Sequence, residues 1–471
     1  MKKTAFLFLI IFLEGYIVLS AEMLAIRQTI PFVGSGTDTV SIIIAAVLMP
    51  LAVGYYAGGR FKGNVRRRLI RNLLIAGTVL TAGLSFLVLH TFFGVLLREM
   101  GWHNRLLLTT LYSVLFLVVP IYLLGQTVPL ISHYFGHARL PQTTGKILFF
   151  STVGSFIGAV FTTIVLMNTV GVSGAVICTI IGISALIILL SKRRNGMRAI
   201  VGGIILAMAA LALNSGPALR HLHIVAENPY NTAQIAIQGK KRPVRYLQLN
   251  RSYASAVFED DNSLVYKYTK YIDRYFLKTF KMANKKGRIL VIGAGGFTMG
   301  LKDEWNEYVF VDIDPALQDI AEKEFLKQKI LKNKTFVAQP VRSYLNQTDE
   351  KFDLVISDTG RGLTGTPEHL VTQEYFQQIR THIKEDGVFV AHFGLSIMMQ
   401  DEFSQHLDTT LRSVFPYLSR QITGGYNPWK IENNDHTSIL YIGRISNGAA
   451  PGIYSDNLNT SAIDRDNKLP H

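Results

Sequence analysis

Long apolar runs fill the first 214 residues and constrain the fold of this chain more than any other feature. A helix needs roughly 20 apolar residues to cross a hydrocarbon layer. Seven runs of about this length occur, at residues 4–26, 39–59, 73–97, 106–132, 147–169, 174–190 and 199–214. We therefore predict a transmembrane domain of seven helices over residues 1–214, followed by a soluble part large enough for its own core.

The first apolar run carries two acids. It begins after Lys2 and Lys3, as a secretory signal peptide also does, but Glu14 interrupts it and the small-residue cleavage pattern is poor. We therefore interpret it as a membrane span. Glu14 and Glu22 lie near one face of that helix. Carboxylates inside spans often serve a function; for Glu14 a functional and a structural interpretation stay open, and Glu22 is expected to pair with Arg27.

Loop charges predict which side of the membrane each loop faces. The net charge is +15, and much of it lies in the loops at residues 60–71 and 192–198. Such loops are typical of the cytoplasmic side, so we expect the N-terminus there, in the cell (inner) membrane. Anionic membrane lipid explains these charges, and nucleic acid is not an expected partner.

Small residues in the membrane half have a structural interpretation. Gly154 and Gly158 give a face suited to helix packing. The single cysteine, Cys178, lies inside an apolar run. No disulfide framework and no thiolate metal site are therefore expected, and we predict no metal site.

The soluble part begins with a β-rich segment at residues 215–265. Apolar and polar residues alternate there, which predicts a small antiparallel sheet with strands at 223–225, 233–237, 244–249 and 255–258. Residues 266–282 have helical spacing, with aromatic side chains on one face. The tail, residues 446–471, has a composition typical of disorder.

Residues 266–445 alternate between strand and helix patterns. Strands are expected at 289–292, 308–312, 335–338, 353–357 and 387–393, helices at 315–327, 372–384 and 401–414, and an antiparallel pair at 418–423 and 437–443. This order predicts an α/β Rossmann-like domain built on a parallel sheet with an antiparallel edge.

The clearest ligand-binding pattern follows the apolar strand Ile289–Ile292. That strand ends in a turn with Gly293 and Gly295, and the next strand ends in Asp312, with Asp314 beside it. In doubly wound sheets a glycine turn that opens a helix lets backbone approach a nucleoside, and an acid about 20 residues on holds the ribose hydroxyls. The pattern predicts a nucleoside site here.

A further acid, Asp358, follows the apolar strand at 353–357 and opens a glycine loop that contains Arg361. Ligands of such sheets lie at the carboxyl ends of the strands, so Asp358 is expected in the same crevice. It can take a proton from an attacking nucleophile there, or simply cap a helix. Arg361 can bind a carboxylate or phosphate, or lie solvated, and both interpretations stay open.

In their order, these motifs resemble the spermidine synthase (polyamine aminopropyltransferase) family, in its form with a fused N-terminal membrane domain. In the soluble part the resemblance runs through Glu227–Asn231, Tyr246–Asn250, Gly293–Phe297, Val311–Asp314, Asp358–Arg361 and Pro367–Phe376. In the membrane half, Gly125–Leu130 and Gly154–Gly158 are similar to the fused form.

The resemblance implies transfer of an aminopropyl group from decarboxylated S-adenosylmethionine to putrescine, with no permanently bound cofactor. It also implies a Rossmann-like fold of the S-adenosylmethionine-dependent transferase type, a homodimer, and Asp358 as the catalytic proton acceptor. The donor-binding residues carried over are Gly293, Gly295, Asp312, Asp314 and Asn231. The acceptor-side residues carried over are Tyr230, Tyr268, Arg361 and Pro367.

Several positions depart from the family pattern. The acid expected at the donor's amino end is Gly296, the acid near the adenine is Pro340, and the second acid of the catalytic loop is Arg361. The family's Tyr-His-Glu near the acceptor reads Tyr268–Lys270. Putrescine is a dication, and an Arg in place of an acid repels it. An anionic or neutral acceptor fits these residues better.

Three functions follow from these observations. The first is a membrane-bound, aminopropyltransferase-like enzyme of polyamine biosynthesis that acts on an amine or another acceptor. The second is an S-adenosylmethionine-dependent methyltransferase, and the third a catalytically degenerate nucleoside-binding or partner module. The expected partners are membrane lipid, a nucleoside donor and an unknown acceptor. Loop charges with seven spans place the soluble part outside the cytoplasm, whereas the chemistry of the donor places it inside.

Overall fold

The computed structural model describes residues 2–102, 104–135, 140–191, 196–359, 367–424 and 436–445. The chain divides into two compact units, Met1–Gln234 and Ile235–His471. The domain boundary expected at residue 214 therefore falls inside the first unit.

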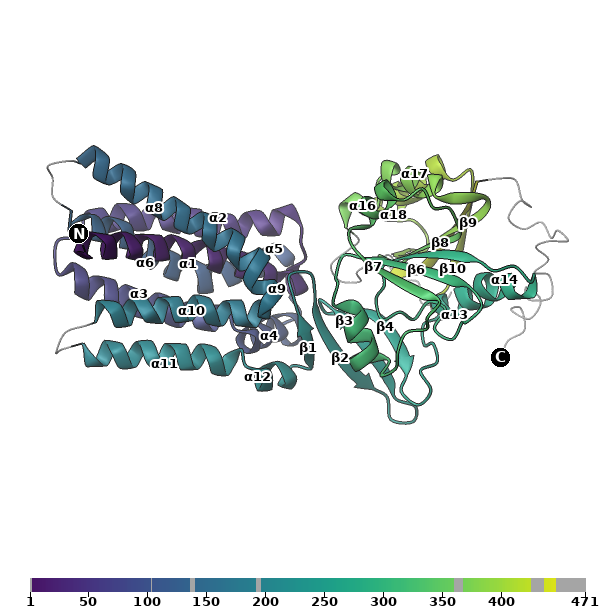
Figure 1. Cartoon of the computed structure of the whole chain (residues 1–471), viewed down its shortest axis with the longest axis horizontal. Coiled ribbons are helices and arrows are strands. Elements are labelled where there is room, and N and C mark those ends of the chain that lie inside the picture. Colours follow the sequence, from purple (N-terminus) through teal and green to yellow (C-terminus); the bar gives the residue numbers. More distant parts are fainter. Residues whose placement is uncertain are drawn as a thin grey trace. The chain divides into compact units, whose positions relative to one another are not determined.

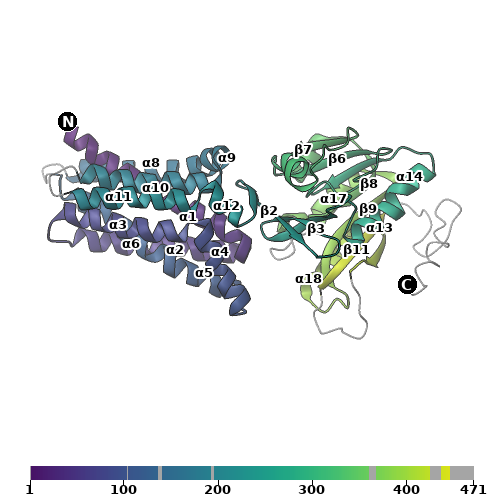
Figure 2. The same ribbon diagram turned by 90° about the horizontal axis from the view of Figure 1, so that it is seen from below.

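The first unit is an α-helical bundle whose long helices run along a common direction (Figures 1 and 2). Its helices are α1 (Lys2–Val33), α2 (Thr37–Gly59), α3 (Val65–Gly83), α4 (Phe86–Gly94), α5 (Arg105–Ser113), α6 (Val119–Gly125), α7 (Thr127–Ser132), α8 (Leu140–Val160), α9 (Met167–Thr169), α10 (Gly171–Leu190), α11 (Met197–Leu213) and α12 (Gly216–His221). π-Helical turns extend three of them, at Val95–Glu99, Val114–Val118 and Phe161–Leu166.

Six helical segments in the described residues are long and apolar enough to cross a membrane. They are Thr4–Val33, Thr37–Gly59, Arg105–Ser132, Gln142–Thr169, Gly171–Leu190 and Met197–His221. The remaining predicted span, at 73–97, falls on α3 and α4, which meet at a bend of 62°. The number of segments is therefore six, or seven if this bent pair is one span.

Glycines bring α1 and α8 into backbone contact. A Cβ atom on Gly154 would lie 2.1 Å from the Phe12 carbonyl oxygen, and one on Gly158 would lie 2.3 Å from that of Tyr16. Helices approach this closely only where side chains are small. The predicted role of these two glycines in helix packing is therefore confirmed.

The chain that follows α12 is tied back to the bundle. Glu227 ends strand β1 (Ile224–Glu227), which pairs antiparallel with β2 (Thr232–Gln238). Its carboxylate accepts the backbone N–H of Ser173 at 2.9 Å, in the first turn of α10. Arg27 of α1 donates to the Asn228 carbonyl at 2.9 Å. These bonds keep residues up to 234 with the helices, because Glu227 satisfies N–H groups that the helix start leaves unpaired.

The second unit begins with a hairpin of β3 (Val244–Leu249) and β4 (Ser252–Phe258). Its two-residue turn, Asn250 and Arg251, has φ values of +49° and +66°. Positive φ at both positions matches the right-handed twist of the strands. Antiparallel pairing of β1 with β2 and of β3 with β4 agrees with the alternating pattern of this segment.

A seven-stranded sheet in the order β10-β11-β9-β8-β5-β6-β7 forms the centre of the second unit. Its strands are β5 (Arg288–Ile292), β6 (Glu307–Asp312), β7 (Lys334–Ala338), β8 (Phe352–Ser357), β9 (Ile383–Ser396), β10 (Tyr417–Ile422) and β11 (His436–Arg444). β5 to β9 pair in parallel, and β11 and β10 add an antiparallel edge. The predicted Rossmann-like sheet is confirmed, and its strand order reverses between β5 and β8, where such sheets bind ligands.

Helices cover this sheet (Figure 1). They are α13 (Lys267–Ile272), α14 (Lys278–Met282), α15 (Leu317–Ile320), α16 (Val341–Gln347), α17 (Gln373–Thr381) and α18 (Glu402–Val414). Val341 of α16, Phe376 of α17 and Leu411 of α18 belong to the core on one face of the sheet. The sequence patterns did not predict α16, because seven residues are too few for a clear helical period.

No helix follows the glycine turn directly, although one commonly does in doubly wound sheets. Residues 293–306, all of them described, form turns between β5 and β6. Phe297 has a φ of +57°, which a right-handed helix cannot contain. Its ring is 1% exposed and lies 4.8 Å from the ring of Phe310. Core packing of this aromatic side chain therefore replaces the helix.

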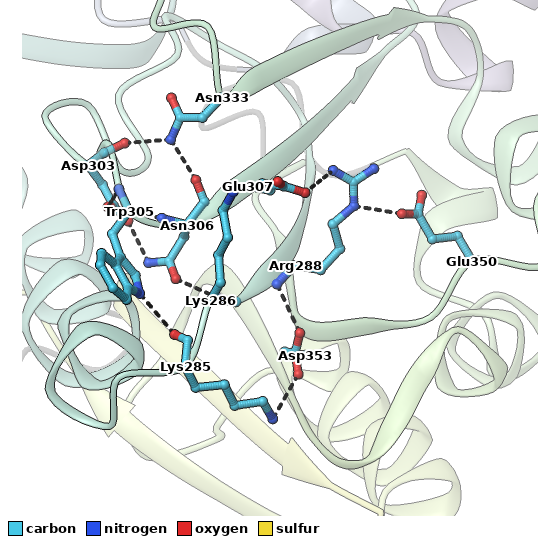
Figure 3. Close-up of polar contacts among 11 residues, drawn as sticks. Lys285, Lys286, Arg288, Asp303, Trp305, Asn306, Glu307, Asn333, Glu350 and Asp353 are labelled. Carbon is cyan, nitrogen blue, oxygen red and sulfur yellow. Dashed lines mark hydrogen bonds and ion pairs between the residues drawn. The ribbon is translucent and has the colours of Figure 1, made fainter.

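Polar side chains tie the amino ends of the central strands together (Figure 3). Asp353 of β8 accepts the Arg288 backbone N–H of β5 at 2.9 Å and the Lys384 ammonium of β9 at 2.8 Å. Arg288 donates to Glu350 at 2.6 Å. This cluster lies at the end of the sheet opposite to the carboxyl ends of the strands, so we assign it a structural role.

Candidate active site

Asp358 lies where β8 ends, directly beside the glycine turn that ends β5. Its backbone N–H donates to the Ile292 carbonyl at 2.8 Å. Gly293 has a φ of +89°, and a Cβ atom there would lie 2.4 Å from the Asp358 carbonyl oxygen. Only glycine fits this position. The structure thus brings Asp358 and the glycine turn together at one edge of the sheet.

Both carboxylate oxygens of Asp358 have partners. The Tyr268 hydroxyl donates to Oδ2 at 2.8 Å, and His392 Nδ1 lies 2.9 Å from Oδ1. A carboxylate oxygen accepts, so Nδ1 is the donor in this contact. The Asp358 side chain is 16% exposed and that of His392 18%. The carboxylate is therefore oriented by the protein and still reaches solvent.

Two hydroxyl groups extend this contact beyond His392. Its Nε2 lies 2.8 Å from the Ser438 hydroxyl, which lies 2.9 Å from the Thr423 hydroxyl. When Nδ1 holds the proton, Nε2 accepts from Ser438. A continuous line of hydrogen bonds therefore runs from Asp358 through His392 to the ends of β10 and β11.

Tyr268 is held by ring stacking. Its ring lies 3.8 Å from that of His392 at an interplanar angle of 6°, and 5.7 Å from that of Tyr266. Burial, the charge of Asp358 and the hydrogen bond to it raise the pKa of Tyr268 well above its ordinary value. Tyr268 is therefore a neutral donor to the carboxylate at every physiological pH.

The acids that follow β6 differ in their surroundings. Asp312 is half-buried and accepts the backbone N–H groups of Ala294 at 3.0 Å and Asp314 at 3.1 Å. It therefore braces the glycine turn and keeps part of its carboxylate at the surface. Asp314 is 0% exposed and accepts the Ala316 N–H at 3.0 Å. A buried carboxylate with this local bond fits a structural role better than ligand binding.

The turn itself is held by β4. Gly295 has a φ of +48°, and the Gly296 N–H donates to the Ser255 hydroxyl at 2.9 Å. A Cβ atom on Gly296 would lie 2.4 Å from the ring of Phe325. The place of the family's donor-binding acid is therefore filled by an aromatic ring, which explains the glycine at position 296.

The remaining predicted site residues are Tyr230, Asn231, Pro367 and Arg361. Tyr230 and Asn231 belong to the first unit, where their N–H groups donate to the Asn228 side chain at 2.9 and 2.8 Å. Pro367 precedes a single 3₁₀ turn, Glu368–Leu370. Arg361 lies outside the described residues. Within the described part of the chain, no cluster of three or more His, Cys, Asp or Glu side chains could hold a metal ion.

Sequence reasoning missed His392, Ser438, Thr423 and Ser255. All of them lie on strands of the unit or just beyond one, where they carry no motif of their own. The one local signal is that His392 interrupts an otherwise apolar strand, Val388–Phe393. A polar residue at such a position points to a partner at the carboxyl edge.

Part of the second unit matches a known family. Residues 275–423, which contain Asp358 and His392, match the family described as "Spermine/spermidine synthase domain". The C-terminal region of this chain is a spermidine synthase domain.

Curated relatives of the spermidine synthase domain match in part. "Polyamine aminopropyltransferase 2" of Aquifex aeolicus is 25% identical over 150 residues, which are 30% of this chain and 29% of that protein. "Polyamine aminopropyltransferase" of Vibrio vulnificus is 30% identical over 138 residues, 28% of this chain and 44% of that protein. The chain thus spans less than half the length of each of these relatives.

Solved structures that match part of the chain include a "probable spermidine synthase" from Corynebacterium glutamicum, with a TM-score of 0.41 and 18% identity over 50% of this chain and 84% of that chain. A spermidine synthase in complex with the transition-state analogue AdoDATO has a TM-score of 0.39 and 19% identity over 52% of this chain and 80% of that chain.

Proposed function

We propose that the second unit transfers an aminopropyl group from decarboxylated S-adenosylmethionine to an acceptor, with Asp358 as the proton acceptor. This proposal rests on the position of Asp358. Tyr268 and His392 orient its carboxylate, and its backbone carbonyl lies directly beside Gly293 of the glycine turn. When bound, the donor supplies a sulfonium whose propyl carbon is open to attack, with methylthioadenosine as the leaving group.

The residues of the chain have distinct parts in this proposal. Asp358 takes the proton that the acceptor loses on attack. Tyr268 and His392 hold the carboxylate in place, because each contacts one of its two oxygens at hydrogen-bond distance. Gly293 lets the Asp358 backbone approach the turn, and Asp312 offers a carboxylate to the ribose hydroxyls.

The charges of the chain argue against a simple diamine as the acceptor. Lys270, in the position of a family acid, is exposed and lies 5.7 Å from the ring of Phe258. Arg361 replaces the second acid of the catalytic loop. Two cations in place of acids repel a dication, so we propose an acceptor of lower positive charge.

We further propose that the helical unit anchors this enzyme in a membrane. The support is the set of six long apolar segments in the described residues and the basic loops that flank α3 and α11.

The test is donor choice with the purified full-length protein in detergent. We expect decarboxylated S-adenosylmethionine to bind at least about tenfold more tightly than S-adenosylmethionine. We also expect methylthioadenosine to be released with an acceptor from a panel of neutral, anionic and cationic amines.

Asp358→Asn is expected to lower the release of methylthioadenosine by about 10²- to 10⁴-fold with donor binding retained. Asp386→Asn, at a surface acid whose side chain is 78% exposed, is the matched control. Tighter binding of S-adenosylmethionine with methyl transfer would contradict the proposal and favour a methyltransferase.

A second candidate is a nucleoside-binding module without turnover. The ring of Phe325 at the place of the donor-binding acid favours it, since the amino end of the donor then lacks its anion. Donor binding without methylthioadenosine release from any acceptor, and equal in wild type and Asp358→Asn, would select this candidate.

A further inference from the structure

Glu14 is the most deeply buried acid of the helical unit. It lies in α1 with 1% of its surface exposed, and neither carboxylate oxygen has a hydrogen-bond partner among the described residues. An ionised carboxylate without a partner is very costly in an apolar interior, far more than the neutral acid. Such residues within apolar helices usually serve a function.

The helix contact beside Glu14, between α1 and α8, leaves no room for a countercharge. The neighbouring residue, Gly15, faces α8 so closely that a Cβ atom there would lie 2.3 Å from the Ser151 carbonyl oxygen. The backbones of α1 and α8 touch at this level and again at Gly154 and Gly158. A side chain as large as Lys or Arg cannot enter this contact.

The charged groups on the helices around α1 are engaged or exposed. Asp38 of α2 and Arg105 of α5 pair with each other at 2.7 Å. Arg27 donates to the segment at 228–232, and Lys146 of α8 is exposed. Of the described titratable side chains on these helices, Tyr55 of α2 is the one in electrostatic contact with Glu14.

Tyr55 also supplies a route to the surface. Its side chain hydrogen-bonds to Ser151 of α8, and it is 37% exposed. It lies about one turn before the end of α2 at Gly59, where the basic loop that follows begins. Two hydroxyl groups therefore stand between Glu14 and the end of the bundle that carries the basic loops.

We propose that Glu14 binds an exchangeable proton inside the helical unit, with Tyr55 and Ser151 as its link to the end of α2. The proton is the cation that fits, because it needs no cavity and neutralises the carboxylate without a partner side chain. The proposal concerns the first unit alone and does not depend on the activity of the second.

The first test is labelling of the full-length protein in membrane vesicles with dicyclohexylcarbodiimide, followed by peptide mass spectrometry. This reagent reacts with a protonated carboxyl in an apolar site. We expect an adduct on Glu14 whose yield falls at least about fivefold from pH 6 to pH 9. The adduct is expected to be lost in Glu14→Gln and kept in Glu22→Gln, a matched change on the same helix. Protection by sodium or potassium at constant pH would overturn the proposal in favour of a metal-cation site.

Thermal stability as a function of pH is a second test, which does not require the reagent to reach Glu14. Gln is a neutral isostere of protonated Glu, so Glu14→Gln is expected to match the melting temperature of the wild type at about pH 4, where the unfolded chain also holds most of this proton. The wild type is then expected to lose stability relative to this variant as the pH rises to 9, because the unfolded chain releases a proton that the folded chain retains on Glu14. A variant less stable than the wild type by the same amount across this range would show an ionised, partnered Glu14 and overturn the proposal.

Discussion

At the scale of single residues, the contact between Asp358 and His392 distinguishes this site. Sequence motifs identified the carboxylate, and the fold supplied an imidazole at 2.9 Å and a phenol at 2.8 Å. Each of these two groups contacts one carboxylate oxygen of Asp358 and so fixes its orientation. In the proposed reaction, His392 would act through Asp358 as a positioning residue.

Substitution of His392 tests this role. We expect His392→Ala to lower kcat for methylthioadenosine release by about 10- to 100-fold with little change in the donor KM, because Asp358 loses a donor that orients it. His392→Gln retains an N–H donor and is expected to recover much of that loss. The control is His382→Gln, since His382 is also buried and bonded through both nitrogens, at 2.8 and 2.9 Å, outside the site. Equal losses in the Ala and Gln variants would contradict a positioning role.

A second prediction at this scale concerns Gly296. Gly296→Asp would place a Cβ atom 2.4 Å from the Phe325 ring. We expect it to destabilise the second unit by about 1–3 kcal/mol through overpacking. Phe325→Ala in the same chain is expected to relieve the clash at the cost of a cavity, and thermal unfolding of the two single variants and the double variant measures both effects. Additive losses in the double variant would show that the two side chains do not compete for one space.

At the scale of the elements, the polar cluster around Asp353 holds the strands that carry the site (Figure 3). Asp353 is 4% exposed and bonds to β5 and β9, with a further ion pair to Lys285 at 3.1 Å. Burial alone would raise the pKa of Asp353, but the hydrogen bonds from Lys384, the Arg288 N–H and Lys285 lower it below its ordinary value.

We expect Asp353→Ala to destabilise the second unit by about 1–3 kcal/mol, because the Arg288 N–H and two ammonium groups lose their acceptor. A carboxyl with a lowered pKa stabilises the fold above its unfolded value and loses that contribution as the pH falls below about 3.8. The difference between wild type and variant in denaturant unfolding should therefore shrink at acid pH. Glu350→Ala, which removes a surface ion pair to Arg288, is the control and should cost less than about 1 kcal/mol.

At the scale of the whole molecule, two contacts within the first unit predict on which side of the membrane that unit ends. Glu227 bonds to the first turn of α10, and the basic loop at 192–198 follows the end of that helix. Arg27, which bonds to Asn228, lies near the end of α1 that is remote from the N-terminus. The segment at 227–234, with which the first unit ends, therefore lies at the end of the bundle opposite to the basic loops.

Cysteine labelling tests this topology. In a Cys178→Ser background, Asp386→Cys reports on the second unit and Lys62→Cys on the basic loop. Basic loops face the cytoplasm, so we expect a membrane-impermeant maleimide to label Asp386→Cys in intact cells and Lys62→Cys only after lysis. Aminopropyl transfer would then need a donor supplied on that outer side. Labelling of both positions only after lysis would contradict the topology and place the second unit beside a cytoplasmic donor.

Much of the architecture could be predicted from the sequence, because its signals are local. Apolar runs predicted the long helices, and alternating strand and helix patterns predicted the parallel sheet with its antiparallel edge. The glycines at 293 and 295 and the acid at 358 marked the carboxyl edge of that sheet. Each of these signals depends on periodicity or on residue type within a few positions.

Other features depend on residues far apart in the chain, and only the tertiary structure decided them. Strand order and register bring His392 of β9 and Ser438 of β11 to Asp358 after β8. Phe325 reaches Gly296 through packing that no local pattern records, and Phe297 turns into the core directly after the glycine turn. Hydropathy and spacing determine which elements form, whereas the contacts between elements determine which side chains meet, because those contacts depend on the packing of the whole unit.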